Sequence, residues 1–421
     1  MSVDRSSGTL LLVIPPVVEL ADSGYALDGD FANNLRAYLR SFGHVTVACP
    51  AIPQSPHNGL VKTVPFSTIE DRERLTFIPL PYTYREDRHL IHYLRTRAIL
   101  REEVQKADYL LFSPHAVFDW STLAAKIAIS TGRSFDMEAD GDGYNISRLQ
   151  ISKMPFGLKK VRQILLAEHY KRVYLNCLSK SSVALLQGQE VFDAYSALSP
   201  NPRKVLNVQV TQSDIISPEE LDMKLKGQKK GLPITITYAG RAIERKGPLD
   251  WLNAIHWLIG QGIELHATWY GEGPLLPEMQ ETVTRLGIGL FVDLAGAVPR
   301  SELMLAQRRS DIFMFCHKAI ESPRCLVEAL ACGCPIVGYG SPFARDLVAE
   351  RGGGEFVEID DWQGLAAKVA QLVNDRAQLV KLTSEAAHSA RLYDRDSAIQ
   401  HRIDLIKKFV KPPIRSLDNN A

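Results

Sequence analysis

The chain has 421 residues, of which 49 are Lys or Arg and 48 are Asp or Glu, and its formal net charge is +1. A general nucleic-acid binder usually carries a strong basic excess, so this charge balance argues against a nucleic-acid partner. The hydrophobic share of 45% excludes an intrinsically disordered chain, and the length predicts about two or three domains.

Short apolar runs alternate with helical patterns in the first half of the chain. Thr9 to Ile14 is a continuous apolar run that ends at two prolines, which is typical of a buried parallel strand. The elements expected after it are a helix over 31–42, strands over 45–48 and 109–112, and a helix over 121–130. Strands that alternate with helices predict a doubly wound parallel sheet.

The alternation weakens after Leu206 and resumes at Ile234. The expected strands cover 234–239, 265–270, 291–295, 312–315 and 335–338, and the expected helices cover 248–259, 275–286 and 323–332, with further helix from 361. We therefore predict an α/β protein with two facing Rossmann-like domains and a cleft between them. In such sheets, ligands bind at the carboxyl ends of the strands.

The change of pattern also sets the expected domain boundaries. We predict an N-terminal, acceptor-side domain over residues 1–212 and a C-terminal, nucleotide-sugar donor-binding domain over 233–397, the two roles following from the resemblance described below. We expect a polar, lysine-rich linker with a surface helix over 213–232 to join the two domains. A last helix, at about 398–415, is expected to pack back on the first domain.

A loop rich in cations, Gly240–Pro248 (GRAIERKGP), follows the first strand of the second half and precedes a helix. Gly240 permits a tight exit from the strand, and Gly247 lets the backbone come close to a ligand. Arg241 and Lys246 can converge from the two ends of this loop, beside the N-terminus of the helix. Such a group of charges can cradle a phosphate, although a solvated basic turn is the alternative interpretation.

Residues 321–335 (ESPRCLVEALACGCP) have the pattern of a loop followed by a short helix. Ser322 can cap this helix, Pro323 fits its first turn and Gly333 can end it.

Two glutamates flank the start of this helix. Glu321 lies at the mouth of the loop. Glu328 lies within the helix, where its carboxylate can accept two hydrogen bonds from a ribose diol; a surface pair with Arg324 is the alternative. Gly271 and Gly273 follow another expected strand, and a simple turn explains this short glycine pair equally well.

Together, the pieces GRAIERKG, YGEGPL, LAGAVPRSEL and ESPRCLVEALACGCPIVG resemble the donor domain of the GT-B glycosyltransferases, and specifically of the retaining family-four enzymes. The resemblance is strong from Ile234 to about Gly338 and covers the first half of the chain only through its general strand-helix order. It implies that a nucleotide-sugar is held between two Rossmann-like domains. It also implies that the enzyme requires no metal and no other cofactor.

The resemblance assigns roles to individual residues. Arg241 and Lys246 would bind the diphosphate and stabilise the negative charge of the leaving group. Glu321 would contact the donor sugar, and Glu328 would hold the ribose hydroxyls. The other implied donor-binding residues are Gly240, Gly271, Gly273, Ala297, Val298, Ser322, Pro323 and Arg324. Six residues separate the two glutamates, one fewer than the family commonly has.

In the first half, the resemblance leaves more than one position open. The family's glycine pair after the first strand has its nearest equivalent at Gly24. The family's histidine near the transferred sugar has two candidate equivalents, His115 and the loop that contains Asp140 and Asp142. A carboxylate such as Asp140 can polarise an acceptor hydroxyl, so Asp140 is predicted to be catalytic and the other two to lie on the acceptor side.

We therefore expect a retaining glycosyltransferase that moves a sugar from a nucleoside diphosphate, with UDP favoured over GDP, to a hydroxyl of a glycan or a lipid-linked acceptor. Bacterial-type polysaccharide or glycolipid synthesis is the expected setting. The alternatives are a nucleotide-sugar-binding protein without catalytic activity and a GT-B nucleotide-sugar epimerase. A dinucleotide-dependent dehydrogenase is disfavoured because no GxGxxG follows the first strand.

A basic segment over residues 153–172 suggests where the acceptor is met. Six Lys or Arg residues lie there against one acid, Glu168, and apolar residues interleave with them. An amphipathic helix of this kind can lie on anionic lipid; a solvated helix packed on its own domain is the alternative. We expect a cytoplasmic protein that touches the inner face of the cytoplasmic membrane.

The cysteine spacing favours buried thiols over a metal site.

Overall fold

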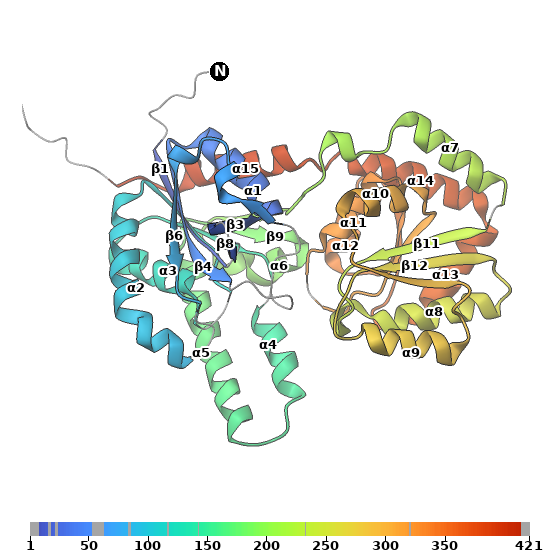
Figure 1. The fold of residues 1–421 in the computed structure, drawn as a ribbon, viewed down its shortest axis with the longest axis horizontal. Helices are drawn as coiled ribbons and strands as arrows, with labels where there is room; N and C mark the ends of the chain where they lie inside the picture. The colour runs from blue at the N-terminus through green and yellow to red at the C-terminus, as the bar shows by residue number, and fades with distance from the viewer. Residues whose placement is uncertain are drawn as a thin grey trace, which may run out of the picture. The chain divides into compact units, whose positions relative to one another are not determined.

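The computed structural model describes residues 8–15, 18–21, 24–52, 63–82, 86–115, 118–141, 143–231, 233–319 and 321–413. The chain forms two compact units, which we call unit 1 (residues 1–206 with 398–421) and unit 2 (residues 207–397) (Figure 1). Each unit is an α/β domain built on its own sheet. In the described part of the chain, no helix combines the length and the apolar composition that a membrane span needs.

Unit 1 is built on a mostly parallel sheet. Its strands are β1 (Thr9–Val13), β2 (Val18–Ala21), β3 (Gly24–Asp28), β4 (His44–Ile52), β5 (Thr63–Pro65), β6 (Leu75–Leu80), β7 (Tyr109–Phe112), β8 (Asp136–Ala139), β9 (Val183–Gln187) and β10 (Pro202–Val205). They lie in the order β10-β9-β8-β7-β1-β4-β2-β3-β5, and β6 also pairs with β4. Only β3 runs antiparallel to its neighbours among these described strands.

Helices cover both faces of this sheet. They are α1 (Gly29–Ser41), α2 (Glu86–Lys106), α3 (Trp120–Ser130), α4 (Gly143–Ser152), α5 (Leu158–Lys180), α6 (Gly188–Tyr195) and α15 (Arg395–Phe409). Alternate residues of β1 face two separate cores: Leu11 and Val13 pack with α2, α3 and α5, whereas Leu10 and Leu12 pack with α1 and α15. Burial on both faces explains why this run is apolar, and the expected buried parallel strand is confirmed.

Unit 2 is built on a fully parallel sheet in its described residues. The strands are β11 (Ile234–Ala239), β12 (Leu265–Tyr270), β13 (Val292–Gly296), β14 (Ile312–Phe315), β15 (Ile336–Tyr339) and β16 (Gly354–Val357), in the order β13-β12-β11-β14-β15-β16. The helices are α7 (Pro218–Lys229), α8 (Pro248–Gly260), α9 (Leu276–Leu286), α10 (Arg300–Arg309), α11 (Arg324–Ala331), α12 (Pro342–Val348), α13 (Trp362–Asn374) and α14 (Arg376–Ala390). The predicted α/β architecture with two Rossmann-like domains is confirmed.

The segment expected to be a linker, 213–232, contains α7 and is part of unit 2. Ser217 and Glu220 form a capping box that starts the helix after Thr211–Asp214, and Pro218 occupies its first turn. Gln228 is buried and donates hydrogen bonds to Asp311 and Thr383. Polar side chains therefore make contacts that the search for apolar periodicity does not detect.

The last helix, α15, packs on the sheet of unit 1 through Ile399, Ile403 and Ile406. Arg402 of this helix forms an ion pair with Glu138 of β8 and donates to the carbonyl oxygen of Leu206 at 2.9 Å. The helix ends at Phe409, before the expected end at about 415. The last helix is thus attached to a strand that lies far away in sequence.

We predict that Arg402→Ala strongly destabilises unit 1. The side chains of Arg402 and Glu138 are only 8% and 16% exposed. Loss of the guanidinium would leave a largely buried carboxylate without its cation, which costs about 3–5 kcal/mol. Urea unfolding measures this loss. Arg395→Ala on the same helix removes a pair with the exposed Asp396 and should cost less than about 1 kcal/mol; equal losses would contradict the prediction.

Candidate functional site

The site in unit 2 is placed by the order of its strands. The chain runs from β11 outward to β12 and β13, then returns to β14 on the other side of β11 and continues to β15 and β16. The carboxyl ends of β11 and β14 therefore lie side by side at the point where the winding direction reverses. Ligands of doubly wound sheets bind at such a point. Residues 240–248 follow β11, and residues 316–323 follow β14.

Glycines let the loops after β11, β12 and β13 contact one another. The backbone N–H of Gly240 donates to Tyr270 at 2.8 Å, and that of Gly271 donates to Gly296 at 2.7 Å. A Cβ atom on Gly271 would lie 2.1 Å from the carbonyl oxygen of Gly240, and one on Gly273 would lie 2.5 Å from that of Ala242. These glycines thus have a structural reason to be glycine, and their contact with a donor stays a prediction.

Lys246 and Glu321 are brought together by the close approach of two loops. Gly247, with φ of +61°, lies so near β14 that a Cβ atom would meet the Cys316 carbonyl oxygen at 2.4 Å. The Lys318 N–H also donates to the carbonyl oxygen of Arg245 at 2.8 Å. As a result, the Lys246 Nζ lies 2.5 Å from Glu321 Oε1, with side chains only 12% and 18% exposed.

The other cations near these loops differ in how they are paired. Arg245 Nε lies 3.8 Å from Glu321 Oε2. Lys318 Nζ lies between the carboxylates of Asp250 and Asp360, at 2.7 and 2.8 Å. Arg241 is exposed and forms no ion pair with the residues that the structure describes. Arg241 and Lys246 thus share a loop, but one faces solvent and the other faces Glu321.

His317 is a residue of this site that the sequence analysis missed. Its side chain is buried at the end of β14, and its Nε2 lies 2.8 Å from the hydroxyl of Tyr238. Its Nδ1 lies 3.9 Å from Glu321 Oε1. Burial first, and then the charges of Lys246 and Arg245, hold the pKa of His317 well below its usual value. The imidazole is therefore neutral, and its contact with Glu321 is not an ion pair.

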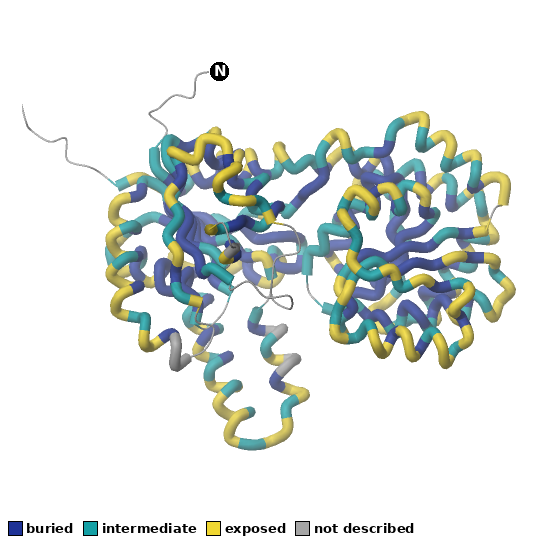
Figure 2. The backbone as a smooth tube through the Cα atoms, viewed as in Figure 1, coloured by how far each residue is buried: buried dark blue, intermediate teal, exposed yellow. Residues whose placement is uncertain are grey.

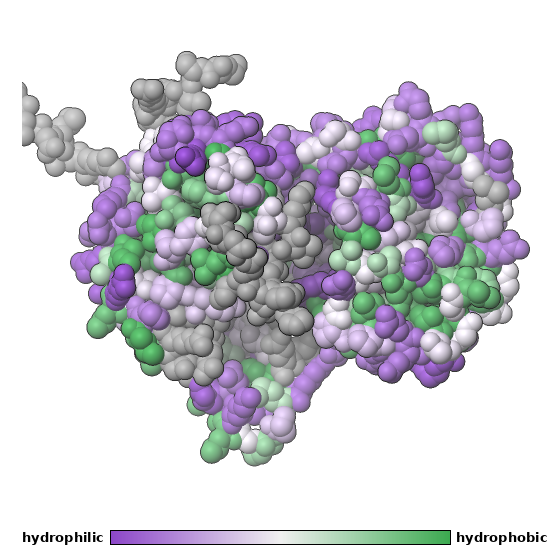
Figure 3. Space-filling model, in the orientation of Figure 1, coloured by the Kyte–Doolittle hydropathy of each residue, from purple (hydrophilic) through white to green (hydrophobic). Residues whose placement is uncertain are grey.

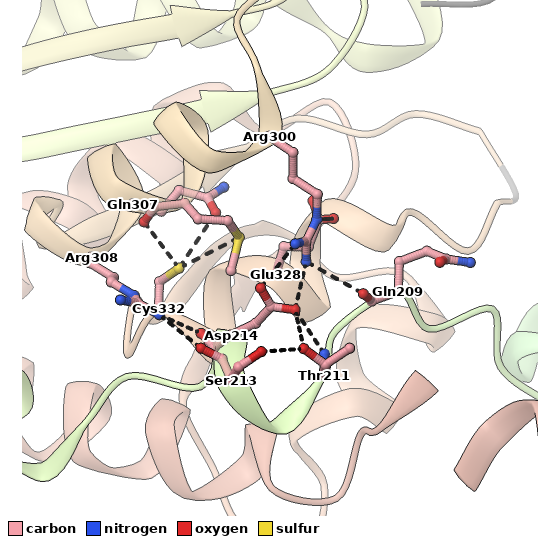
Figure 4. Close-up of polar contacts among 10 residues, drawn as sticks. Gln209, Thr211, Ser213, Asp214, Arg300, Gln307, Arg308, Glu328 and Cys332 are labelled. Carbon is pink, nitrogen blue, oxygen red and sulfur yellow. Dashed lines mark hydrogen bonds and ion pairs between the residues drawn. The ribbon is translucent and has the colours of Figure 1, made fainter. Parts of the chain in front are cut away.

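Glu328 lies on α11, against Arg300 at the start of α10 (Figure 4). Arg300 Nε lies 3.4 Å from Glu328 Oε1, and its two Nη atoms reach the two oxygens of Asp214 at 2.9 and 3.1 Å. Burial alone would raise the pKa of Asp214, but the hydrogen bonds from Arg300 and Thr211 lower it. Asp214 and Arg300 are therefore both ionised at neutral pH.

Arg300 is a second residue that the sequence analysis missed, although it lies in the quoted piece LAGAVPRSEL. A cation in the first turn of a helix is opposed by the helix dipole, so its position there points to specific carboxylate partners. Because α10 begins directly after Ala297 and Val298, the contact of Arg300 with Glu328 joins Glu328 to the segment that follows these two residues, which the resemblance assigns to donor binding.

Three more predicted residues precede or begin α11. The helix starts at Arg324 with Pro323 as its N-cap residue and without a side-chain cap, so the expected capping by Ser322 is wrong. Gly333 has φ of +59° and follows the end of the helix, as expected. The contacts of Ser322, Pro323 and Arg324 with a donor stay predictions.

The candidates of unit 1 also lie at strand ends. His115 follows β7, and its backbone N–H donates to Asp119 Oδ2 at 2.7 Å. Asp140 is exposed and follows β8, the neighbour of β7. Gly24 starts β3 in a hairpin with β2, where its φ of +120° requires glycine for the turn. Asp142 lies outside the described residues.

Two further features are separate from these residues. A cavity of about 470 Å³ lies beside Thr235 and Asp311, at the amino ends of β11 and β14, and so at the opposite end of the sheet. No group of three or more His, Cys, Asp or Glu side chains in the described ranges is placed to hold a metal ion.

Residues 221–389 match the family described as "Glycosyl transferases group 1". The matched residues lie within unit 2. They include the Lys246–Glu321 pair and the Arg300–Glu328 contact.

Two curated relatives match this chain over part of their length. The chain is 26% identical to the amylovoran biosynthesis glycosyltransferase AmsK of Erwinia amylovora over 177 residues, which is 41% of this chain and 43% of the relative. It is 27% identical to alpha-monoglucosyldiacylglycerol synthase of Streptococcus pneumoniae over 81 residues, 19% of this chain and 18% of the relative. The matches thus span less than half of either curated relative.

Among solved structures, HepE from Anabaena in complex with UDP matches with a TM-score of 0.68 at 15% identity, over 95% of this chain and 100% of HepE. At this identity the match shows the fold alone. Since it covers both units, the chain has the two-domain GT-B fold that the sequence predicted.

We predict that Gly271→Ala disrupts the site by steric conflict. Its Cβ would overlap the Gly240 carbonyl oxygen, and overpacking of this kind costs about 1–3 kcal/mol in addition to the strain of a positive φ. Gly287→Ala is the matched control, since Gly287 has φ of +67° and open space around it. Urea unfolding followed by tryptophan fluorescence measures both. Equal losses of stability would show that the loops do not depend on this contact.

Proposed function

We propose that the protein is a glycosyltransferase that moves a sugar from a nucleoside diphosphate to an acceptor hydroxyl with retention of the anomeric configuration. The observation that carries this proposal is the Lys246–Glu321 pair at the strand ends of a group 1 glycosyltransferase domain. UDP is the proposed nucleotide; HepE, whose fold this chain shares, is solved with UDP, with UDP and glucose, and with UDP-glucose.

In the proposed reaction, Lys246 and Arg241 bind the diphosphate and stabilise the charge that develops on the leaving group. Glu321 contacts the donor sugar, and Glu328 holds the ribose hydroxyls. Lys246 has to share its charge between Glu321 and the diphosphate, so the donor enters a site where the cation is already fixed in place. Cations held in this way lower the barrier because they need little reorganisation during the reaction. We propose that neither a metal nor another cofactor takes part.

The proposed acceptor is a hydroxyl of a glycan or of a lipid-linked sugar. One curated relative is named for amylovoran biosynthesis, and the other is named for a glucosylated diacylglycerol. In unit 1, His115 and the loop of Asp140 and Asp142 are the proposed acceptor contacts, and the Asp140 carboxylate would polarise the hydroxyl. Residues 153–172 would bring the protein to the cytoplasmic face of an anionic membrane.

The alternatives remain a binding protein without catalytic activity and a nucleotide-sugar epimerase. Radiolabelled UDP-glucose separates them from the proposed enzyme. A binding protein would retain the labelled donor unchanged, an epimerase would convert it to a different UDP-sugar, and a transferase would release UDP and label an acceptor. Release of UDP that depends on an added acceptor carries the proposed function.

We predict that Lys246→Ala lowers turnover of UDP-glucose by about 10²–10³-fold, the usual effect of removing one preorganised contact to the developing charge. Lys229→Ala, which removes an exposed lysine of the same unit, is the matched control and should leave turnover unchanged. Thermal unfolding of both variants checks the fold. Near-normal turnover of Lys246→Ala would mean that this lysine does not act on the diphosphate.

We predict that Glu328→Ala mainly weakens nucleotide affinity. Hydrogen bonds to a charged group contribute about 1.5–3 kcal/mol, so the dissociation constant for UDP should rise by roughly tenfold or more. Calorimetry with UDP and GDP measures this change and identifies the preferred base. Asp214→Asn is the control, since it disturbs Arg300 from the other side without removing Glu328. An equal loss in both variants would assign Glu328 to a structural role only.

A further inference from the structure

Large apolar side chains are exposed at the tip of a helical hairpin in unit 1. The hairpin consists of α4 and α5, which pack on each other through Tyr144, Ile151 and Ala167 and project from the rest of the unit (Figure 1). At its turn, Phe156 and Leu158 are 93% and 91% exposed. Val161, Ile164 and Leu165 continue this apolar strip along the first turns of α5, and all three are exposed.

A second exposed apolar strip lies on α2. Leu90, Ile91 and Leu94, near the N-terminus of this helix, are 71%, 77% and 79% exposed. Figure 3 shows hydrophobic surface over this part of α2 and at the hairpin tip, with hydrophilic surface between. Isolated exposed apolar residues are common, but clustered ones mark interaction sites.

Both helices change character along their length. The C-terminal halves of α2 and α5 pack in one core of unit 1 through Leu100 and Val104 and through Tyr174 and Cys177. The N-terminal halves are mostly exposed (Figure 2). Packing on the domain explains the buried halves, but it gives no reason for the apolar residues of the exposed halves.

The two exposed ends lie at the same edge of unit 1. α2 leads into β7 and α5 leads into β9, and β7, β8 and β9 are parallel. Because both helices pack on the same face of the sheet, they run opposite to these strands. Their N-termini therefore point to the edge of the sheet that is formed by the carboxyl ends of these strands. His115 and Asp140 lie at this edge, and α4 begins there, with the backbone of Gly143 against His115.

Basic residues predominate around the two strips, although Glu86 and Asp87 precede the α2 strip in sequence. No acid occurs from 89 to 101, where Arg95, Arg97 and Arg101 are exposed on α2. Lys159 and Arg162 are exposed on α5. The one acid of residues 153–172, Glu168, accepts a hydrogen bond from Tyr144, and Lys171 lies over the same Tyr144 ring.

We propose that the exposed N-terminal ends of α2 and α5, together with the 153–157 turn, form one docking surface for an anionic lipid bilayer. Phe156 and Leu158 enter the boundary between headgroups and acyl chains, and the α2 strip lies on it as a second contact. The arginines and lysines bind lipid phosphates. This composition matches a bilayer surface, which offers an apolar layer beneath a layer of negative charge.

The surface extends the contact proposed for residues 153–172 to a second helix. It also gives the contact a direction, since the membrane would face the edge of unit 1 that carries His115 and Asp140. Only this last consequence, delivery of a lipid-linked acceptor to that edge, rests on the proposed function. Lipid binding itself does not involve the donor site, so it is tested without any transfer reaction.

The experiment is co-flotation of the full chain with vesicles of phosphatidylcholine alone or mixed with phosphatidylglycerol, at low and at physiological salt. We expect binding to the mixed vesicles that weakens as salt rises. The double variants Phe156→Gln with Leu158→Gln, and Leu90→Gln with Leu94→Gln, should each weaken binding by about tenfold or more. Glutamine forms helices well, and the replaced side chains are largely exposed, so folding should be unaffected.

The charge contribution has its own variant. Arg95→Gln, Arg97→Gln and Lys159→Gln combined should weaken binding to the mixed vesicles by about fivefold per charge. The matched controls lie in unit 2: Leu290→Gln replaces a leucine that is 91% exposed, and Lys229→Gln with Lys230→Gln removes two exposed lysines. Both controls should bind like the unchanged chain.

Several results would overturn the proposal. One is an unchanged chain that does not float with anionic vesicles at low salt. Another is binding that neither apolar double variant reduces. Equal binding to both kinds of vesicle would refute the role of the basic residues. A concentration-dependent dimer, dissociated by the Phe156 and Leu158 variant, in a chain that binds no vesicles would assign this surface to a second copy of the chain.

Discussion

The close approach of two loops, after β11 and after β14, is the constraint on which the proposed donor site depends. The backbone at Gly247 lies so near Cys316 that no side chain fits between them. This contact fixes the position of the backbone beside Lys246. The hydrogen bond that the Lys318 N–H donates to the Arg245 carbonyl oxygen fixes the position of the loop after β14. Because both loops continue from buried strands, the 2.5 Å separation of Lys246 and Glu321 follows from the sheet.

Three partly buried cations of unit 2 are paired with carboxylates, whereas Arg241 is exposed. Lys246 is held by Glu321, Arg300 by Glu328 and Asp214, and Lys318 by Asp250 and Asp360. Partly buried ions without partners would be costly, so the pairing allows several charges to lie close together in a folded domain. A diphosphate would then replace one carboxylate partner of a cation. The neutral His317, which lies beside Glu321, adds no charge to this pairing.

Unit 1 is distinguished by exposed apolar and basic side chains rather than by a cluster of paired charges. Its sheet is covered on both faces, and its last helix is attached by the buried pair of Arg402 and Glu138. Its exposed apolar side chains gather where α2 and the α4–α5 hairpin extend past the core. A chain with a net charge of +1 thus concentrates basic and apolar residues at one edge of one unit. Overall composition conceals this asymmetry, and the arrangement of the helices reveals it.

The sequence by itself determined the α/β class, the two domains and the loops that carry the site. Buried parallel strands are apolar, as at Thr9–Val13, and glycines mark the tight strand exits at 240 and 271 and the close approach at 247. Both signals are local, so a single sequence is enough to detect them. The family resemblance added the interpretation of Lys246, Glu321 and Glu328.

Only the tertiary structure decided which charges meet. Arg300 contacts Glu328 across 28 positions of sequence, and Arg402 contacts Glu138 across 264. The sequence analysis considered Arg324 as the partner of Glu328, because pairs within one helix are the ones that spacing reveals. The segment of α7 was predicted to be a linker with a surface helix, because its side chains are mostly polar. Side-chain pairing across strands depends on sheet order, which the pattern of one segment does not contain.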